Sequence, residues 1–295
     1  MKESVVLSLD TMATRFELVL HGDDSSRLRL IGEEAITEIE RWGDCLSIYE
    51  SDSEMYRINA KAADEPVKTD ARLFRLLQHC AELSALTGGT FDISVAPLMR
   101  VWGFMGGAGR MPDPAEIEKA MEVVGMHHVR FDDKHFTISF DRKGVMLDLG
   151  AVGKGYAIER AAGILKEHGI TSALLHGGTS TVYAIGTEPD GSPWKIAIQD
   201  PRNPHKHLDV VELSDSSLSV SAVHGKSFFH KGRELGHVID PRTGQPVQGA
   251  QAAAVIGPSP TDCDALSTAL LVLGESGLSI LADRFPDYRA IVASD

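Results

Sequence analysis

The segment PSPTDCDALSTAL, residues 258–270, carries two oxygen-bearing side chains four positions apart, Asp264 and Thr268. Residues at this spacing are neighbours on a helix surface, so both side chains would project from one face. A carboxylate and a hydroxyl are hard ligands that suit Mg²⁺, which commonly keeps waters and phosphate oxygens as its other ligands. The alternative is a threonine that bonds back to the preceding turn beside a solvated aspartate. Taken alone, the segment favours that alternative.

A glycine-rich turn occurs in LDLGAVGKGYAIE, residues 147–159. A strand followed by such a turn and a helix start predicts an anion site, because free backbone N–H groups point outward there. The segment is not a Walker A loop, since Asp148 stands where that motif needs its first glycine and Gly155 stands where it needs Ser or Thr. A tight connection with Lys154 on the surface is an equally good interpretation.

The segment GHVIDPRTGQPV, residues 236–247, places His237 three residues before a turn sequence at 240–244. A histidine at this position could act as a general base near neutral pH. A structural histidine beside a hydrogen-bonded turn is the alternative, and local sequence favours it.

Aromatic residues gather in TGGTFDISVAPLMRVWGF, residues 87–104. Its two glycines allow close backbone approach, and Phe91, Trp102 and Phe104 offer flat apolar surfaces for a ring system. Burial in the core is the commoner fate of such side chains.

The hydrophobic pattern predicts the elements that would position these segments. Helices are expected at about 28–45, 71–88, 114–125, 154–168 and 260–273. Strands are expected at 14–20, around 129, and at 136–140, 145–149, 174–175, 182–185, 194–198, 210–213 and 252–256, before a short final helix and a strand near 290–292. Because helices and hairpin-like strand runs are mixed, we predict an α+β fold with mixed, largely antiparallel sheets flanked by helices. We assign residues 1–295 to a single domain and leave open a smaller subdomain around 60–130.

Net charge, cysteine spacing and hydrophobic pattern limit the classes of partner and the cellular location that the sequence allows. The chain has 295 residues and a net charge of −13, which argues against nucleic acid and anionic membranes. Its three cysteines form no CxxC pair. Residues 1–22 lack the apolar core of a signal peptide, and no apolar stretch approaches the ~18 residues that span a bilayer. We therefore predict a cytoplasmic protein without membrane insertion. An acidic protein that holds an anionic cofactor needs a metal or local cations.

In chain order, these segments resemble the FAD:protein FMN transferases, the ApbE-like flavin transferase family. The resemblance covers most of the chain. It runs through Met12-Ala13-Thr14, residues 46–49 and 53–59, FDISVAPLMRVWGF, LDLGAVGKGYAIE, Gly177-Gly178, HVIDPRTGQPV and DALSTALLVLG.

The resemblance implies roles for particular residues. Asp264, Thr268 and the backbone carbonyl of Ala151 would hold Mg²⁺ on the pyrophosphate of FAD. His237, as candidate base beside the cofactor, and Asp264 are the implied catalytic residues. The remaining implied contacts to the dinucleotide come from Met12, Tyr49, Thr90, Phe91, Asp92, Asp148 and Lys154.

The resemblance also implies a reaction. A Thr or Ser hydroxyl of an acceptor protein would attack the FMN phosphorus of FAD, and AMP would leave. If water attacked instead, the protein would be an FAD pyrophosphatase. Two departures motivate a third reading, a catalytically weak FAD-binding protein: Thr179 replaces an aspartate of the family, and Ala222 replaces a glycine. A fourth interpretation is that the chain is an unrelated α+β protein whose motifs match the family by coincidence. Such a protein would not bind FAD.

Two substitutions would test these roles. One carboxylate on a helix face is expected to contribute little to a core, so Asp264→Ala should remove activity without unfolding the protein. His237→Ala should slow transfer and spare FAD binding.

Overall fold

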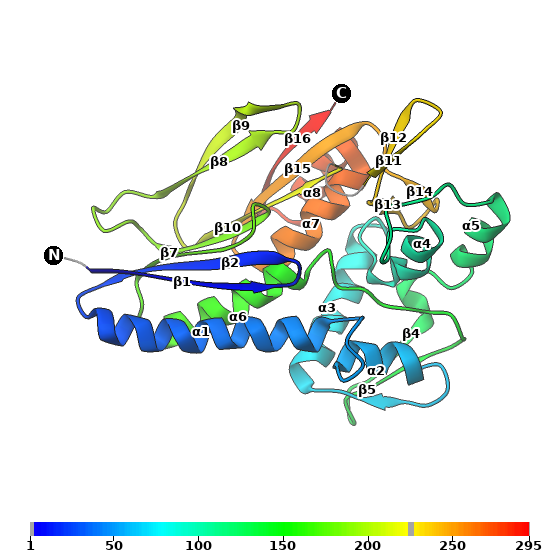
Figure 1. Ribbon diagram of the computed structural model, residues 1–295, viewed down its shortest axis with the longest axis horizontal. Helices are drawn as coiled ribbons and strands as arrows, with labels where there is room; N and C mark the ends of the chain where they lie inside the picture. The colour runs from blue at the N-terminus through cyan, green and yellow to red at the C-terminus, as the bar shows by residue number, and fades with distance from the viewer. Residues whose placement is uncertain (1–2, 224–226, 295) are drawn as a thin grey trace.

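The computed structural model describes residues 3–223 and 227–294, and its centre is an antiparallel sheet of seven strands. Figure 1 shows this sheet running across the molecule. In spatial order its strands are β1 (Glu3–Thr11), β2 (Thr14–Gly22), β6 (Ser172–Gly177), β7 (Thr181–Gly186), β10 (Ser216–Ala222), β15 (Ala250–Gly257) and β16 (Arg289–Ser294).

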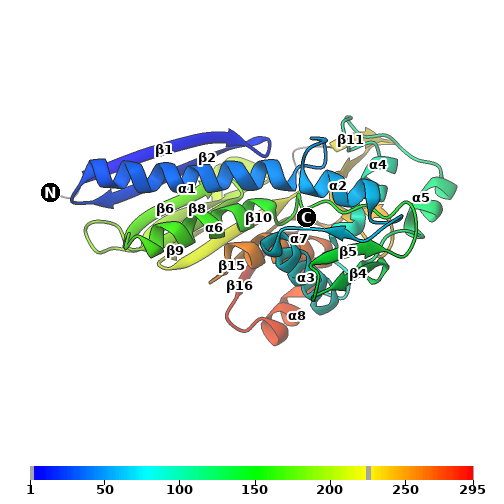
Figure 2. The same ribbon diagram turned by 90° about the horizontal axis from the view of Figure 1, so that it is seen from below.

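Three helices cover one face of the sheet: α1 (Ser25–Leu46), α6 (Gly153–Glu167) and α7 (Pro260–Leu273). Figure 2 shows α1 and α6 side by side across the strands, with α7 next to α6. The main core lies in this layer, because the helices turn their apolar side chains toward the sheet. The opposite face is covered by a hairpin of β8 (Trp194–Asp200) and β9 (Asn203–Leu213), which buries Trp194 and Leu213 against Leu218 and Ala254.

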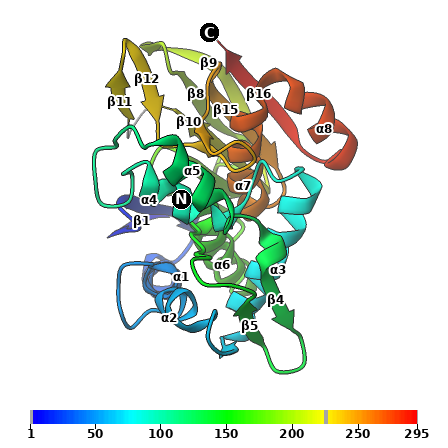
Figure 3. The same ribbon diagram turned by 90° about the vertical axis from the view of Figure 1, so that its right-hand side faces the viewer.

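A second group of elements packs at one end of this sandwich (Figure 3). Its helical segments are α2 (Glu54–Lys61), α3 (Ala71–Leu86), η1 (Ile93–Val95), α4 (Ala96–Val101), α5 (Pro114–Met121) and η2 (Met126–His128). Its strands are β3 (Val67–Lys68), β4 (Val129–Asp132), β5 (Thr137–Phe140), β11 (Ser227–His230), β12 (Arg233–Gly236), β13 (Ile239–Asp240) and β14 (Gln245–Pro246). The chain ends through η3 (Gly274–Ser276), α8 (Gly277–Arg284) and β16.

The predicted α+β class is confirmed, and so are most expected elements. Capping explains several boundaries: Asp70 accepts from the N–H of Arg72 at the start of α3, and Ser259 accepts from the N–H of Asp262 at the start of α7. The sequence did not predict β1 or β10. The division of the chain into domains stays a prediction.

The expected strand at 145–149 is wrong, since this stretch is irregular. The Asn59 side chain accepts from the N–H of Leu147 at 2.8 Å and donates to its carbonyl at 2.9 Å. The N–H of Asp148 donates to the carbonyl of Ile93 at 2.7 Å. These bonds give the backbone N–H and C=O groups their partners without a neighbouring strand. The apolar run therefore forms an irregular connection in place of the expected strand.

The expectation that no apolar stretch reaches bilayer length is also wrong. Among the described residues, one helical run, Pro260–Arg284, is long and apolar enough by composition to cross a membrane. Its first part is α7, which lies between α6 and the strands β10 and β15 and is buried along most of its length. A helix buried on several sides in a folded domain has the same composition. The prediction that the protein does not insert into a membrane remains a prediction.

Candidate functional site

Asp264 lies on α7 with a side chain that is almost fully buried. Its Oδ2 accepts the Gly155 N–H at 2.9 Å, and its Oδ1 accepts the Thr181 hydroxyl at 3.3 Å. The Lys154 ammonium lies 3.8 Å from Oδ1. Burial raises the pKa of Asp264, while Lys154 and the two hydrogen bonds oppose that rise. The solvated-aspartate interpretation is therefore wrong.

This burial also corrects the expectation for Asp264→Ala. The substitution would leave the Gly155 N–H and the Thr181 hydroxyl without their acceptor inside the protein. An unsatisfied buried group costs about 1–3 kcal/mol, so alanine is expected to lower stability as well as activity. Asparagine is the better test, because it keeps the size of the side chain.

The first turn of α6 approaches α7 closely because residue 155 is a glycine. A Cβ at Gly155 would lie 2.3 Å from the carbonyl oxygen of Pro260, which is closer than atoms can pack. Glu159, one turn further along α6, accepts from the Ser259 hydroxyl at 2.7 Å and from the Thr261 N–H at 3.2 Å. The glycine and this carboxylate together fix the start of α7 against α6.

Hydroxyls from β7 and β10 complete the surroundings of Asp264. Ser219 donates to the Thr181 hydroxyl at 3.0 Å, and Thr181 in turn donates to Asp264. Ser221 lies 3.0 Å from the hydroxyl oxygen of Thr268. Thr268 also bonds back to the Asp264 carbonyl at 3.4 Å, as the structural interpretation expected. Sequence reasoning missed these hydroxyls. Their signal is the alternation of serine at 217, 219 and 221, which places the serines on one face of a strand.

The predicted magnesium ligands are all oxygen donors, the ligand type that this ion prefers, and their binding of Mg²⁺ stays a prediction. Asp264 is a carboxylate with acceptor capacity beyond its two hydrogen bonds. The Gly155 N–H donates to Asp264, and over residues 3–223 and 227–294 no backbone N–H donates to the carbonyl oxygen of Ala151. The same part of the chain contains no group of three His, Cys, Asp or Glu that could hold a metal. A site here would therefore rely on one carboxylate, with Thr268 and Ala151.

A cavity of about 410 Å³ adjoins this cluster, and Lys154 belongs to both. The cavity is lined by Thr11, Met12 and Ala13 at the β1–β2 turn, by Gly43, Asp44 and Leu46 at the end of α1, by Ser47, Ile48, Tyr49 and Glu50 after α1, and by Asp148, Leu149, Gly150, Gly153 and Lys154. Four predicted dinucleotide contacts, Met12, Tyr49, Asp148 and Lys154, thus share one cavity. Its size is within the usual range for small-molecule sites.

The β1–β2 turn has an unusual backbone where it borders this cavity. Met12 and Ala13 have φ of 50° and 56°, in the left-handed region that L-residues other than Asn and Asp seldom adopt. A two-residue turn of this kind matches the twist of the two strands it joins. Such strain persists only where the surrounding structure imposes it, and it is commonly found at functional sites.

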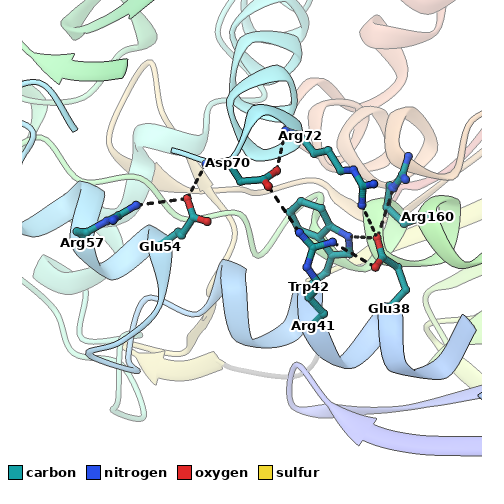
Figure 4. Close-up of polar contacts among 8 residues, drawn as sticks. All are labelled: Glu38, Arg41, Trp42, Glu54, Arg57, Asp70, Arg72 and Arg160. Atoms are coloured by element: carbon teal, nitrogen blue, oxygen red, sulfur yellow. Dashed lines mark hydrogen bonds and ion pairs between the residues drawn. The ribbon is translucent and has the colours of Figure 1, made fainter. Parts of the chain in front are cut away.

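The helices that carry the cavity walls are held together by a charged network around Glu38 on α1 (Figure 4). Its carboxylate accepts from the Trp42 indole N–H at 2.8 Å and from Arg72 of α3 at 3.4 Å. Arg41 lies 3.3 Å away, and Arg160 of α6 lies 3.7 Å away. This network joins the C-terminal half of α1 to α3 and α6.

Three further predicted contacts, Thr90, Phe91 and Asp92, are buried. The Thr90 hydroxyl donates to a backbone carbonyl, and Phe91 belongs to the main core. Asp92 accepts from the N–H and hydroxyl of Ser94 at 2.8 and 2.6 Å, and from the Met126 N–H at 3.2 Å. Asp92 also borders a second cavity of about 500 Å³, between the end of α3 and the turn at 240–244. Their contacts to a ligand stay predictions.

The core interpretation of the other aromatics is confirmed, because Trp102 and Phe104 are buried. The Trp102 indole donates to the carbonyl of Gly244 at 2.8 Å, which joins two of the predicted motifs. The predicted turn at 240–244 is present: the Asp240 side chain accepts from the N–H of Arg242, and Gly244 has a φ of 69°.

His237 directly follows β12 and is half-buried, with its ring centroid 6.4 Å from that of Phe104. The preceding residue, Gly236, packs against Val223 so closely that a Cβ would lie 3.0 Å from the Val223 carbonyl oxygen. Val223 stands two residues after Ser221, the neighbour of Thr268. The end of β10 therefore connects the histidine segment to the Asp264 cluster.

Comparisons with known proteins identify the family of this chain. A model of the ApbE family matches residues 12–292. The crystal structure of the ApbE protein from Thermotoga maritima superposes with a TM-score of 0.91 at 28% identity, covering 99% of this chain and 94% of that chain. The apo flavinyl transferase ApbE of Pseudomonas stutzeri gives 0.87 at 29% identity, covering 100% and 92%. The FAD:protein FMN transferase of Salmonella typhimurium is 29% identical over 277 residues, which are 91% of this chain and 78% of the relative. This chain belongs to the ApbE family.

Proposed function

We propose that this protein transfers FMN from FAD to a Thr or Ser hydroxyl of an acceptor protein, releases AMP and requires Mg²⁺. Its relative in Salmonella typhimurium is named an FAD:protein FMN transferase. The observation that carries the proposal is the position of Lys154, which borders the 410 Å³ cavity and lies 3.8 Å from the buried Asp264. A ring system in that cavity would present its phosphates to this lysine and this carboxylate.

The chain's own groups account for substrate binding. The cavity walls at Met12 and Tyr49 would take a ring of FAD, and the first turn of α6 would point its N-terminal end toward the pyrophosphate. The Lys154 ammonium would neutralise phosphate charge. Positioning and charge neutralisation are the main requirements of phosphoryl transfer.

A Mg²⁺ ion held by Asp264, Thr268 and the Ala151 carbonyl would supply further charge neutralisation at the phosphates. The positive charge of this ion would also reduce the repulsion between a diphosphate and a protein of net charge −13.

In the proposed transfer, the acceptor hydroxyl oxygen bonds to the phosphorus that carries FMN. The bond from that phosphorus to the bridging oxygen breaks, and the bridging oxygen leaves with AMP. The hydroxyl proton goes to His237, whose segment reaches the cluster along the end of β10. A general base of this kind contributes roughly 10²–10⁴-fold to a rate.

The test uses FAD, Mg²⁺ and a peptide library in which a central Thr, Ser or Ala is flanked by random residues other than Thr and Ser. The proposal expects flavin fluorescence on Thr or Ser peptides, none on Ala peptides, and one AMP for each flavin attached. AMP without labelled peptide would instead identify an FAD pyrophosphatase. FAD binding without AMP in any mixture would contradict both activities and leave the weak FAD-binding protein.

A further inference from the structure

The hairpin of β11 and β12 is attached to the molecule by one face only. Its strands pair with each other, Phe229 opposite Glu234, and among the described residues with no other strand. Lys231 and Gly232 form its turn, with φ of 49° and 78°. Turns of this kind match the strand twist and give a well-defined ribbon. Unpaired strand edges present N–H and C=O groups that can accept an added strand.

The two faces of this hairpin differ sharply. On one face Phe228 packs near the rings of Trp102 and Phe104, at centroid distances of 6.4 and 5.9 Å, and Leu235 is buried in the same cluster. On the other face Phe229 is 74% exposed, the highest value among the exposed large apolar side chains of the described residues. Aromatic side chains, phenylalanine among them, are enriched in the cores of protein–protein interfaces, so Phe229 is a candidate contact for a partner protein.

The hairpin leads directly to the candidate base. β12 ends at Gly236, and His237 is the next residue. Glu234, the cross-strand partner of Phe229, stands three residues before His237, which is about 10 Å along an extended strand. A strand added to this hairpin would therefore run toward the place where a hydroxyl must react.

The charge of the hairpin also distinguishes it from the rest of the protein. Lys231 and Arg233 are exposed at its tip, while the whole chain has a net charge of −13. The one acid in the hairpin, Glu234, accepts a hydrogen bond from Ser227 at 2.5 Å. An acidic segment would be repelled by most of the protein and attracted here.

We propose that the β11–β12 hairpin is the docking surface for the acceptor protein. An extended segment of the acceptor adds to the free edge, packs an apolar side chain on Phe229, and places acidic side chains near Lys231 and Arg233. This brings its Thr or Ser hydroxyl to His237. The inference rests on the proposed transferase function and states how that reaction would hold its protein substrate.

The test measures steady-state flavin transfer to the Thr peptide that is labelled best in the library. For Phe229→Asp we expect kcat/KM for the peptide to fall about 10-fold or more, mainly through KM. Because Phe229 is exposed, the fold and the affinity for FAD should be retained. The matched control is Val210→Asp, which places the same charge on a 51% exposed position of the β8–β9 hairpin and should leave KM unchanged.

Combining Lys231→Glu with Arg233→Glu tests whether the positive charge of the hairpin attracts the acceptor. This double variant should weaken transfer to acidic peptides more than to neutral ones, with unchanged FAD affinity. If neither Phe229→Asp nor the double variant changes peptide KM, the docking proposal is wrong while the transferase function stands. If the unaltered protein labels no peptide, the proposed transferase function is wrong, and the docking proposal that rests on it is wrong as well.

Discussion

Two aspartates in the first turns of α7 stand two residues apart and serve different regions of the molecule. Asp262 faces α3 and the C-terminal segment: its carboxylate lies 2.5 Å from the Nε2 atom of His79 and accepts the Tyr288 hydroxyl at 2.7 Å. Asp264 faces α6 and the strands β7 and β10, where Gly155, Thr181 and Lys154 surround it.

The difference lies in the partners. Asp262 pairs with side chains from elements outside the cavity, so its contacts join parts of the fold. The surroundings of Asp264 include a lysine that also lines the cavity, and its neighbour Thr268 offers a further oxygen. The same residue type on the same helix therefore contributes to stability at one position and to a candidate reaction site at the other.

The largest effect is expected for Asp264→Asn. Losing the one carboxylate of the proposed Mg²⁺ site should lower AMP formation about 10³-fold, equivalent to several kcal/mol of charge stabilisation. The protein should stay folded, because asparagine has nearly the same shape. Thermal unfolding with and without Mg²⁺ checks the binding step: stabilisation by the ion should disappear. Stabilisation equal to that of the unaltered protein would show that the ion binds elsewhere.

His237→Ala comes next and separates the proposed base from the proposed metal site. We expect transfer to slow roughly 10²–10⁴-fold with unchanged FAD affinity and unchanged stabilisation by Mg²⁺. Single-turnover transfer and FAD titration measure the two quantities. Turnover equal to that of the unaltered protein would exclude His237 as the base.

Asp262→Asn should reverse the pattern seen at Asp264. Removing a charge-assisted bond to His79 should cost about 1–3 kcal/mol of unfolding free energy. AMP formation at a temperature where the protein is folded should change less than about 10-fold, since His79 and Tyr288, the side-chain partners of Asp262, do not line the 410 Å³ cavity. Urea unfolding and an AMP assay on the same sample compare the two effects. A loss of activity as large as that of Asp264→Asn would contradict the claim that Asp262 contributes to stability and not to the reaction site.

The smallest effect is a dependence of stability on pH. The hydrogen bond to Asp262 raises the pKa of His79. A raised pKa in the folded state means that the stabilisation is fully present below the unfolded value of about 6.5 and is lost as pH rises through the folded pKa. Urea unfolding from pH 6 to 9 should show this decline. In His79→Gln this decline of stability with pH should be absent. A variant whose stability still falls with pH as in the unaltered protein would show that His79 is not its cause.

Local sequence predicted the elements that carry the candidate site, but not its function. Helical spacing placed Asp264 and Thr268 on one helix, and the glycine turn before Lys154 indicated a helix start; α7 and α6 confirm both elements. These inferences depend on periodicity and turn chemistry within short segments, whereas the metal and anion roles stay predictions. The resemblance added the roles of residues such as Met12 and Tyr49, which now share one cavity with Lys154.

Other features depend on contacts between distant segments. Thr181, Ser219 and Ser221 reach the Asp264 and Thr268 side chains only through the order of strands in the sheet. The alternation of serines in β10 indicates a shared strand face, but not which helix that face contacts. Residues 145–149 look like a strand, but a single asparagine replaces the partner strand. The sequence could not separate Asp262 from Asp264 either, because their partners lie on different elements. The cytoplasmic location and the absence of a nucleic-acid partner stay predictions based on charge and sequence pattern.

The most direct test of the central claim compares the two aspartates in one experiment. AMP release from FAD, with the best-labelled Thr peptide present, is measured for the unaltered protein, Asp262→Asn and Asp264→Asn, each in Mg²⁺ and in EDTA. We predict Mg²⁺-dependent AMP from the first two proteins and almost none from the third. AMP release that persists in EDTA, or an Asp264→Asn protein as active as Asp262→Asn, would contradict a metal-dependent pyrophosphate site at Asp264.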